Sequence, residues 1–245
     1  MNREYHRWYS HNLGCDAELL VFGHAGPKLL VFPTFKGRFY TYEDRGMVEV
    51  LRGRLEEGTL QLYCVDGFDE RSFYNDAVPP HERILRHIGF ERYVLDELLP
   101  LVGRNPHPSL ATHGCSLGAY HAMNLALRHP SLFSGVLAFS GRYDLSRGYP
   151  GVRDVFDGYH DENIYFHTPT SYVPNLGDPC LLEQIRRLDI TLMIGRDDPY
   201  LESNRVLSTA LWEKGIWNAL RVCPGHAHNF HDWREMLRNA PLPLP

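Results

Sequence analysis

The pentapeptide Gly114-Cys115-Ser116-Leu117-Gly118 constrains this chain more than any other stretch, because it has the form G-x-S-x-G. An apolar run at 110–113 precedes it, and a helical pattern of small residues follows. This arrangement is typical of a nucleophile elbow, a strained strand-to-helix turn that exposes a serine above a sheet. Such a turn needs both glycines, because a Cβ at either position would clash. A chain of this composition contains the pattern by chance only about 0.08 times.

Strands and helices alternate along the rest of the chain. Two apolar runs at the start, 18–22 and 28–32, flank the turn-rich segment 23–27, which predicts a hairpin. Further strands are predicted at 60–65, 110–113, 136–139, 190–194 and 219–223, and helices at 42–55, 81–99, 117–129, 179–188, 201–214 and 230–238. The pattern predicts an α/β fold with a mostly parallel central sheet, helices on both faces and an antiparallel N-terminal hairpin.

One segment, from about 140 to 176, lacks this periodicity and is rich in Tyr, Asp, Gly and Pro. We interpret it as an irregular, cap-like excursion over the active face of a single domain that spans 1–245. The aromatic stretches 68–74 and 143–172 are expected to shape an apolar acyl pocket, and simple lid packing is the alternative.

Composition excludes several other classes of protein. A formal net charge of −5 gives no general attraction to nucleic acid or to anionic membranes. No apolar run approaches the roughly 20 residues that span a bilayer, and the polar, aromatic residues 1–9 do not resemble a signal peptide. The five cysteines form an odd, widely spaced set without C-x-x-C, which favours reduced thiols in a cytoplasm over a disulfide framework or a zinc site.

A serine nucleophile needs a histidine base and a carboxylate that holds the imidazole ring. Asp197 and Asp198 follow the strand predicted at 190–194, where the acid of such an enzyme is expected. One of the two is expected to be an ordinary turn or N-cap residue instead.

Three histidines, His226, His228 and His231, share the loop after the last predicted strand. Each is a candidate base. The three could alternatively converge on zinc, but no carboxylate ligand or second ligand pair accompanies them. We therefore expect no metal and no cofactor.

Taken together, these motifs resemble the putative-esterase family of α/β-hydrolases, which includes S-formylglutathione hydrolase (esterase D)-like and polyhydroxyalkanoate-depolymerase-like proteins. The resemblance extends from about 29 to 237. The family commonly shows Gly-x-x-Asp, then an aromatic residue or proline, then a helix with Asn-Arg. Because Gly195 to Pro199 and the pair 204–205 match this pattern, the resemblance implies Asp198 rather than Asp197 as the acid.

The same resemblance favours one histidine. The family's histidine is typically followed by an aromatic residue two positions on, by Trp five positions on, and then by a basic residue. His228 fits this pattern with Phe230, Trp233 and Arg234, whereas His231 fits less well and His226 fits worst. His228 is therefore the implied base, and His231 stays the alternative.

The loop after the second apolar run departs from the family, because it contains Phe32-Pro33-Thr34 where many relatives have His-Gly. We expect the backbone N–H of Leu117 to be the first oxyanion donor and that of Thr34 or Phe35 to be the second.

The resemblance implies a serine hydrolase of small-molecule carboxylic esters or thioesters that works through a Ser116–His228–Asp198 triad and an acyl-enzyme. The alternatives are an acyltransferase with the same triad and a noncatalytic binding protein of this fold. No nucleic-acid or membrane partner is expected, and assembly into a homo-oligomer is left open.

Overall fold

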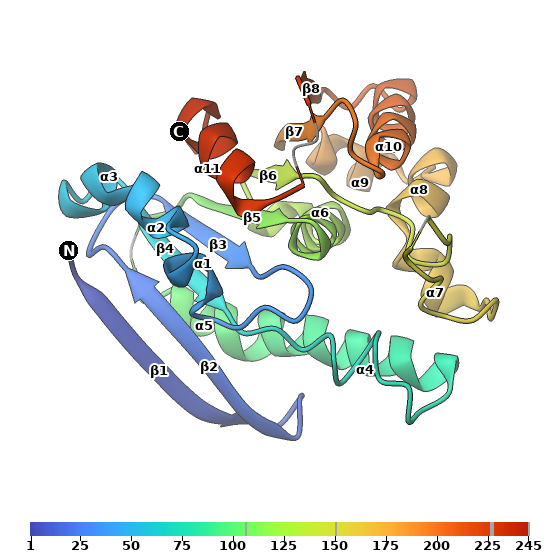
Figure 1. Cartoon of the computed structure of the whole chain (residues 1–245), viewed down its shortest axis with the longest axis horizontal. Coiled ribbons are helices and arrows are strands. Elements are labelled where there is room, and N and C mark those ends of the chain that lie inside the picture. Colours follow the sequence, from blue (N-terminus) through green and yellow to red (C-terminus); the bar gives the residue numbers. More distant parts are fainter. Residues whose placement is uncertain (106, 150, 226–227, 245) are drawn as a thin grey trace.

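Eight strands form one mixed sheet in the computed structural model, which describes residues 1–105, 107–149, 151–225 and 228–244 (Figure 1). The strands are β1 (Arg3–Ser10), β2 (Cys15–Phe22), β3 (Lys28–Phe32), β4 (Gln61–Val65), β5 (Leu110–Cys115), β6 (Gly135–Phe139), β7 (Asp189–Gly195) and β8 (Ala219–Cys223). Their order across the sheet is β1-β2-β4-β3-β5-β6-β7-β8. All neighbouring pairs from β4 to β8 are parallel, which confirms the predicted mostly parallel α/β sheet.

The antiparallel N-terminal hairpin is also confirmed, but the prediction of its strands was wrong. It consists of β1 and β2, whereas the apolar runs 18–22 and 28–32 belong to β2 and β3, which β4 separates. β2 pairs antiparallel with β4, and β3 pairs parallel with β4 on its other side. The turn-rich segment 23–27 therefore carries the chain past β4. β1 was missed because it is an edge strand whose residues are mostly exposed and polar or aromatic.

The helices follow the predicted alternation with local differences, which include two short helices within the segment 140–176 that was predicted to be irregular. They are α1 (Thr41–Asp44), α2 (Met47–Val50), α3 (Arg52–Glu56), α4 (Pro80–Tyr93), the π-helical η1 (Val94–Leu98), α5 (Leu99–Val102), α6 (Leu117–Arg128), the 3₁₀ turn η2 (Pro130–Leu132), α7 (Glu162–Phe166), α8 (Pro169–Tyr172), the 3₁₀ turn η3 (Val173–Asn175), α9 (Pro179–Ile185), α10 (Leu201–Glu213) and α11 (Phe230–Asn239). The helix predicted at 42–55 is three short helices, because Gly46 has a φ of 71° between the first two. The helix predicted to stop at Pro100 continues to Val102, because Pro100 lies in the first turn of α5, where a proline is tolerated.

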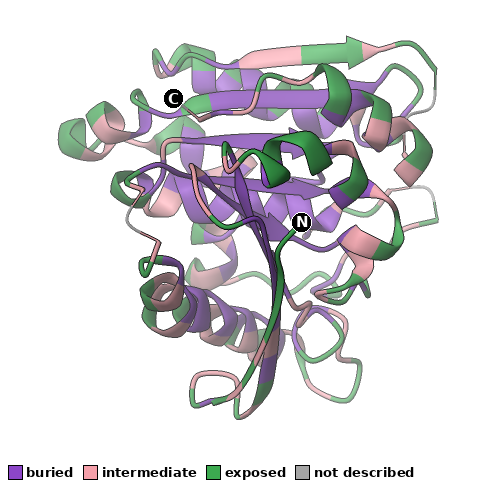
Figure 2. Ribbon diagram, turned by 90° about the vertical axis from the view of Figure 1, so that its left-hand side faces the viewer, coloured by how far each residue is buried: buried purple, intermediate pink, exposed green. Residues whose placement is uncertain are grey.

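Helices cover both faces of the sheet, and the strands alternate between two apolar layers. On β2, Leu19 and Val21 belong to the layer that also contains residues of α4, α6 and α10, whereas Leu20 and Phe22 belong to the layer that contains residues of α1–α3 and α11. Figure 2 shows the inner strands buried on both sides, while the N-terminal strand carries exposed residues. Within the described ranges, no helix is long and apolar enough to cross a membrane.

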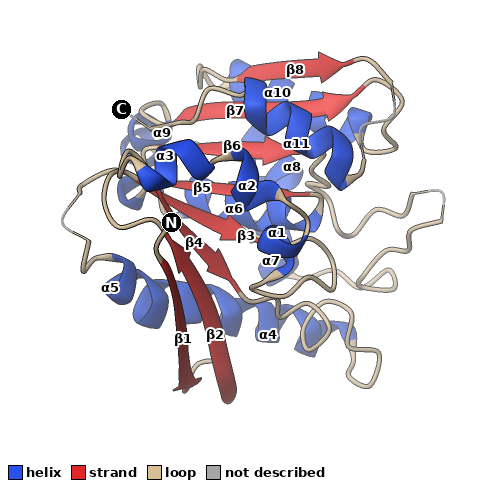
Figure 3. Ribbon diagram, turned by 60° about the vertical axis from the view of Figure 1, so that its left-hand side comes forward, coloured by secondary structure: helices blue, strands red, loops and turns tan. Residues whose placement is uncertain are grey.

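The parallel strands bring several loops to one edge of the sheet. The carboxyl ends of β3, β5, β6, β7 and β8 lie together at this edge (Figure 3). The loops that leave them contain Thr34, Ser116, the segment 140–176, Asp198 and His228. In open α/β sheets, ligands bind at the carboxyl ends of the strands. The fold therefore gathers the predicted site residues from distant parts of the sequence.

Candidate active site

Ser116 lies at a sharp turn between β5 and α6. Its φ of 56° and ψ of −119° lie outside the regions that a residue with a side chain normally adopts. The backbone is held in this conformation by its surroundings, since the N–H of Ser116 donates to the carbonyl oxygen of Phe139 at 2.8 Å. Strained conformations of this kind cluster at functional sites, where the fold maintains them.

Both glycines of the pentapeptide are required by close backbone contacts. A Cβ on Gly114 would lie 2.2 Å from the carbonyl carbon of Gly118, and a Cβ on Gly118 would lie 2.3 Å from the carbonyl oxygen of Phe32. These distances confirm the predicted steric reason for the G-x-S-x-G spacing. They also show that the end of β3 lies directly against the start of α6.

His228 lies between Ser116 and Asp198. Its Nδ1 is 2.8 Å from Asp198 Oδ2, and its Nε2 is 3.2 Å from Ser116 Oγ. Because a carboxylate oxygen only accepts, Nδ1 carries the ring proton and the lone pair of Nε2 faces the serine hydroxyl. This is the arrangement in which an imidazole can take a proton from a hydroxyl group.

The Asp198 carboxylate is also held by a contact other than the one with His228. Its side chain is fully buried, and Oδ1 accepts the N–H of Tyr200 at 2.9 Å. The rings of Tyr200 and Trp233 each contact the His228 ring edge-on, with centroids 5.3 Å away. The indole N–H of Trp233 donates to Ser140 Oγ at 3.1 Å, which orients that wall. Burial raises the pKa of the Tyr200 phenol, so this side chain stays neutral near neutral pH.

The other candidate acid and bases are placed differently. Asp197 is exposed, and its N–H donates to the Gly225 carbonyl oxygen at 3.2 Å. His231 has a side chain that is 76% exposed, and its Nδ1 lies 3.1 Å from Asp232 Oδ1. His226 lies outside the described residues. The structure thus brings Ser116, His228 and Asp198 together and directs His231 toward its sequence neighbour.

The predicted oxyanion donors line the same cavity as Ser116. Leu117 is the first residue of α6, and the N–H groups of a first helical turn have no acceptor within the helix. Thr34 and Phe35 line the same cavity as Ser116 and Leu117. The N-terminus of α6 also favours negative charge at this position.

A cavity of about 710 Å³ opens above Ser116. Its aromatic lining residues are Phe35, Tyr74, Tyr200, Phe230 and Trp233 in addition to the histidines. Of the two stretches expected to supply an aromatic wall, 68–74 contributes Tyr74, and no aromatic residue of 143–172 is among the described lining residues. The stretch members with fully buried rings, such as Phe73 and Tyr143, pack in the core instead. The lid-packing alternative therefore describes most of these aromatics.

The cavity also contains positive charge, which the sequence analysis missed. Arg45, Arg142 and Arg153 line it, and none of the described lining residues is Asp or Glu. Arg142 is 3% exposed and donates to backbone carbonyls at 145, 147 and 153, so it also organises the loop after β6. Arg153 pairs with Asp76 at the cavity rim. The position of Arg142 just after a strand was the signal that could have identified it.

Metal-ligating side chains do not converge in the histidine loop as far as the structure describes it. Among the described residues, one set of three potential metal ligands lies close together. It consists of His87, Glu91 and His167, outside the histidine loop.

Comparison with known proteins supports an esterase. A family model described as "Putative esterase" matches residues 41–241. A search of curated proteins finds no match. Solved structures with the same fold include a ferulic acid esterase, with 18% sequence identity and a TM-score of 0.76 over 99% of this chain and 96% of that chain.

Two further structures are similar. An S-formylglutathione hydrolase from Agrobacterium tumefaciens has 19% identity and a TM-score of 0.75 over 97% of this chain and 92% of its own. FphF of Staphylococcus aureus, a fluorophosphonate-binding serine hydrolase, has 15% identity and a TM-score of 0.71 over 97% and 96%. At these identities the likeness shows a shared fold, the α/β-hydrolase fold.

Proposed function

The chain belongs to the Putative esterase family and is a serine esterase by that membership, and from this premise we propose that Ser116, His228 and Asp198 are its catalytic triad. The observation that carries the proposal is the hydrogen-bonded series from Ser116 Oγ through His228 to the buried Asp198 carboxylate, with distances of 3.2 and 2.8 Å. Both distances lie within the reach that proton transfer and ring orientation require.

The reaction follows from these positions. Ser116 Oγ attacks the acyl carbonyl carbon while His228 Nε2 accepts its proton, and Asp198 stabilises the imidazolium that forms. The N–H of Leu117, together with that of Thr34 or Phe35, donates to the oxyanion. His228 then protonates the leaving alcohol or thiol, and the acyl group stays on Ser116. Water attacks this acyl-enzyme with His228 as base, which releases the acid and restores the serine.

The cavity wall supports a substrate class. Arg45 and Arg142 line the space above Ser116 without an ion-pair partner among the described residues, whereas Arg153 pairs with Asp76, so an ester or thioester that carries a negative charge is favoured over a neutral one of equal size. The five free cysteines favour a reducing compartment such as a cytoplasm.

The test is labelling with a fluorophosphonate probe, followed by mass spectrometry of the modified peptide. We expect labelling of Ser116, and we expect Ser116→Ala to lose both labelling and about 10⁴- to 10⁶-fold of kcat on a short-chain p-nitrophenyl ester. Ser131→Ala is the matched control for labelling, since it removes an exposed serine hydroxyl that does not line the cavity. Wild-type turnover that persists in Ser116→Ala would contradict the triad.

A further inference from the structure

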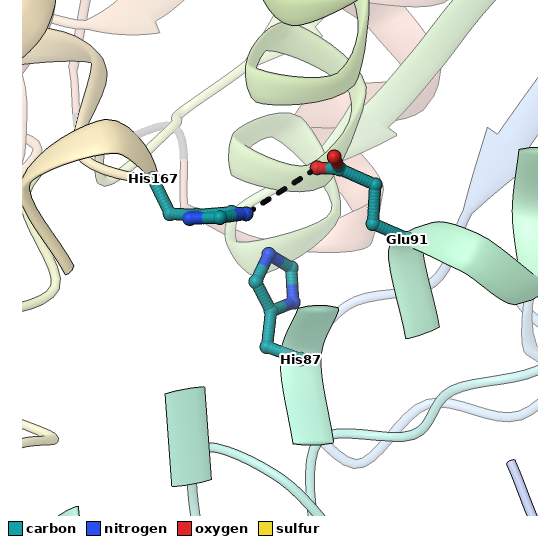
Figure 4. A group of neighbouring side chains, drawn as sticks. All are labelled: His87, Glu91 and His167. Atoms are coloured by element: carbon teal, nitrogen blue, oxygen red, sulfur yellow. Dashed lines mark ion pairs between the residues drawn. The ribbon is translucent and has the colours of Figure 1, made fainter. Parts of the chain in front are cut away.

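A second cluster of titratable side chains lies between α4 and the cap-like segment, and none of its residues lines the cavity above Ser116. His87 and Glu91 are one helical turn apart on α4, and His167 follows α7 in the segment 140–176 (Figure 4). One ligand atom of each lies within 4.8 Å of the others, and all three residues are buried. We propose that His87, Glu91 and His167 bind a divalent transition-metal ion such as Zn²⁺, at a site separate from the esterase centre.

The protonation state of His167 favours a cation next to its ring. Its Nδ1 lies 2.7 Å from the carbonyl oxygen of Asn163, and a carbonyl only accepts, so Nδ1 carries a proton. In the neutral ring the lone pair is then on Nε2, which lies 3.6 Å from Glu91 Oε2. Two acceptors that face each other at this distance repel unless a cation lies between them. The same Nδ1–H to carbonyl contact is what fixes the ring of a metal-binding histidine.

His87 supplies the second, independent argument. It is 3% exposed, and neither of its ring nitrogens has a hydrogen-bond partner among the described residues. A buried polar atom without a partner is destabilising, because it has lost its hydrogen bonds to water. The His87 and His167 rings lie edge to face with centroids 5.3 Å apart, so His87 can turn a nitrogen toward the same point. A metal ion there would satisfy it.

The surroundings of Glu91 determine which metals fit. Arg128 donates to both of its carboxylate oxygens, and His129 lies 3.0 Å from Oε1. These contacts orient the carboxylate, but Arg128 already balances its charge, so an added ion is held mainly by imidazole. Imidazole favours Zn²⁺, Ni²⁺, Co²⁺ and Cu²⁺ and disfavours Mg²⁺ and Ca²⁺. An ion there would join α4 to the segment 140–176, which contributes Arg142 and Arg153 to the active cavity.

The experiment uses untagged, chelator-treated protein and measures Zn²⁺ uptake by equilibrium dialysis with elemental analysis, and Co²⁺ uptake by visible absorption. We expect one equivalent bound, with ligand-field bands for Co²⁺, and a loss of affinity of at least about tenfold in His87→Gln and in His167→Gln. The matched controls are His231→Gln, which tests the catalytic loop, and His81→Gln, which removes an exposed histidine near the start of α4. Both should bind as the wild type does.

Thermal unfolding separates binding from misfolding. Zn²⁺ should raise the Tm of the wild type and of both controls but not that of His87→Gln or His167→Gln, whose metal-free Tm shows whether they fold. Should one of these two fail to fold, the other carries the test. Wild-type uptake no greater than that of His87→Gln would overturn the proposal, and a doubly protonated His167 paired with Glu91 would then explain the geometry. Because uptake and Tm do not depend on turnover, failure here is distinct from failure of the triad.

Discussion

Two histidines in this molecule each have Nδ1 held by an acceptor oxygen, and they differ in the group that their Nε2 faces. In both His228 and His167, Nδ1 is tied to an oxygen that only accepts, a carboxylate in the first and a carbonyl in the second. Nε2 of His228 then faces a hydroxyl that can donate, at 3.2 Å, whereas Nε2 of His167 faces a carboxylate oxygen at 3.6 Å. The same ring is therefore suited to accept a proton in one place and to bind a cation in the other. The partner of Nε2 decides which.

The largest expected effect on activity comes from removing the proposed base, His228. His228→Ala should lower kcat by about 10⁴- to 10⁶-fold, because the hydroxyl of Ser116 loses its proton acceptor. His231→Ala should keep kcat within about threefold, because its exposed ring contacts Asp232 instead of the serine. Steady-state kinetics on a p-nitrophenyl ester measures both, with unfolding curves to verify folding. A large loss in His231→Ala with a normal His228→Ala would reverse the assignment of the base.

How far the sequence could predict these two places differs for a physical reason. The elbow, the parallel strands and the spacing from His228 to Trp233 are local patterns, and parallel topology places the ends of such strands at one edge. His87 and Glu91 also share a predictable helix face, but their partner His167 lies in the segment without periodicity. No local sequence pattern predicts where such a segment folds back.

Two errors of the sequence prediction arise because contacts between distant parts of the chain, which local patterns do not reveal, decide the outcome. β1 was missed and the hairpin misassigned, because an exposed edge strand needs little apolar alternation and pairing depends on long-range register. The arginines of the cavity were missed because a charged residue in a loop is usually solvated. Only the fold shows that Arg142 is buried and lines the same cavity as Ser116.

A third histidine, His113, also has Nδ1 held by a carbonyl oxygen, but its Nε2 faces neither a donor nor a carboxylate. His113 in β5 is fully buried, its Nδ1 lies 2.7 Å from the carbonyl oxygen of Leu137, and its Nε2 has no hydrogen-bond partner in the described part of the chain. Burial lowers its pKa from 6.5 to about 4, although the Leu137 carbonyl opposes this shift. The folded protein therefore keeps this ring neutral while the unfolded chain protonates it.

The sign of the effect on stability follows. Between pH 6.5 and about 4 the unfolded state binds one more proton at this site, so the free energy of unfolding falls as the pH falls. The contribution is about 1.4 kcal/mol per pH unit. His113→Asn, whose amide N–H can still donate to Leu137, should show a shallower decline by about that amount. Urea unfolding at several pH values measures it, and equal slopes for the two proteins would contradict the assignment.

The smallest expected effect concerns the charge of the open site. Arg45 is exposed, lines the cavity and lies 5.4 Å from the ring of Phe230, so it can meet an anionic group of a bound ester. Arg45→Ala should lower kcat/KM for p-nitrophenyl hemisuccinate about 2- to 5-fold relative to neutral p-nitrophenyl valerate. This factor corresponds to the free energy that an exposed ion pair contributes. Arg147→Ala is the matched control, because Arg147 is exposed but does not line the cavity. The selective loss should shrink with added salt, since exposed charges are screened. An equal loss on both esters would show that Arg45 acts through packing and would argue against a charge-selecting cavity.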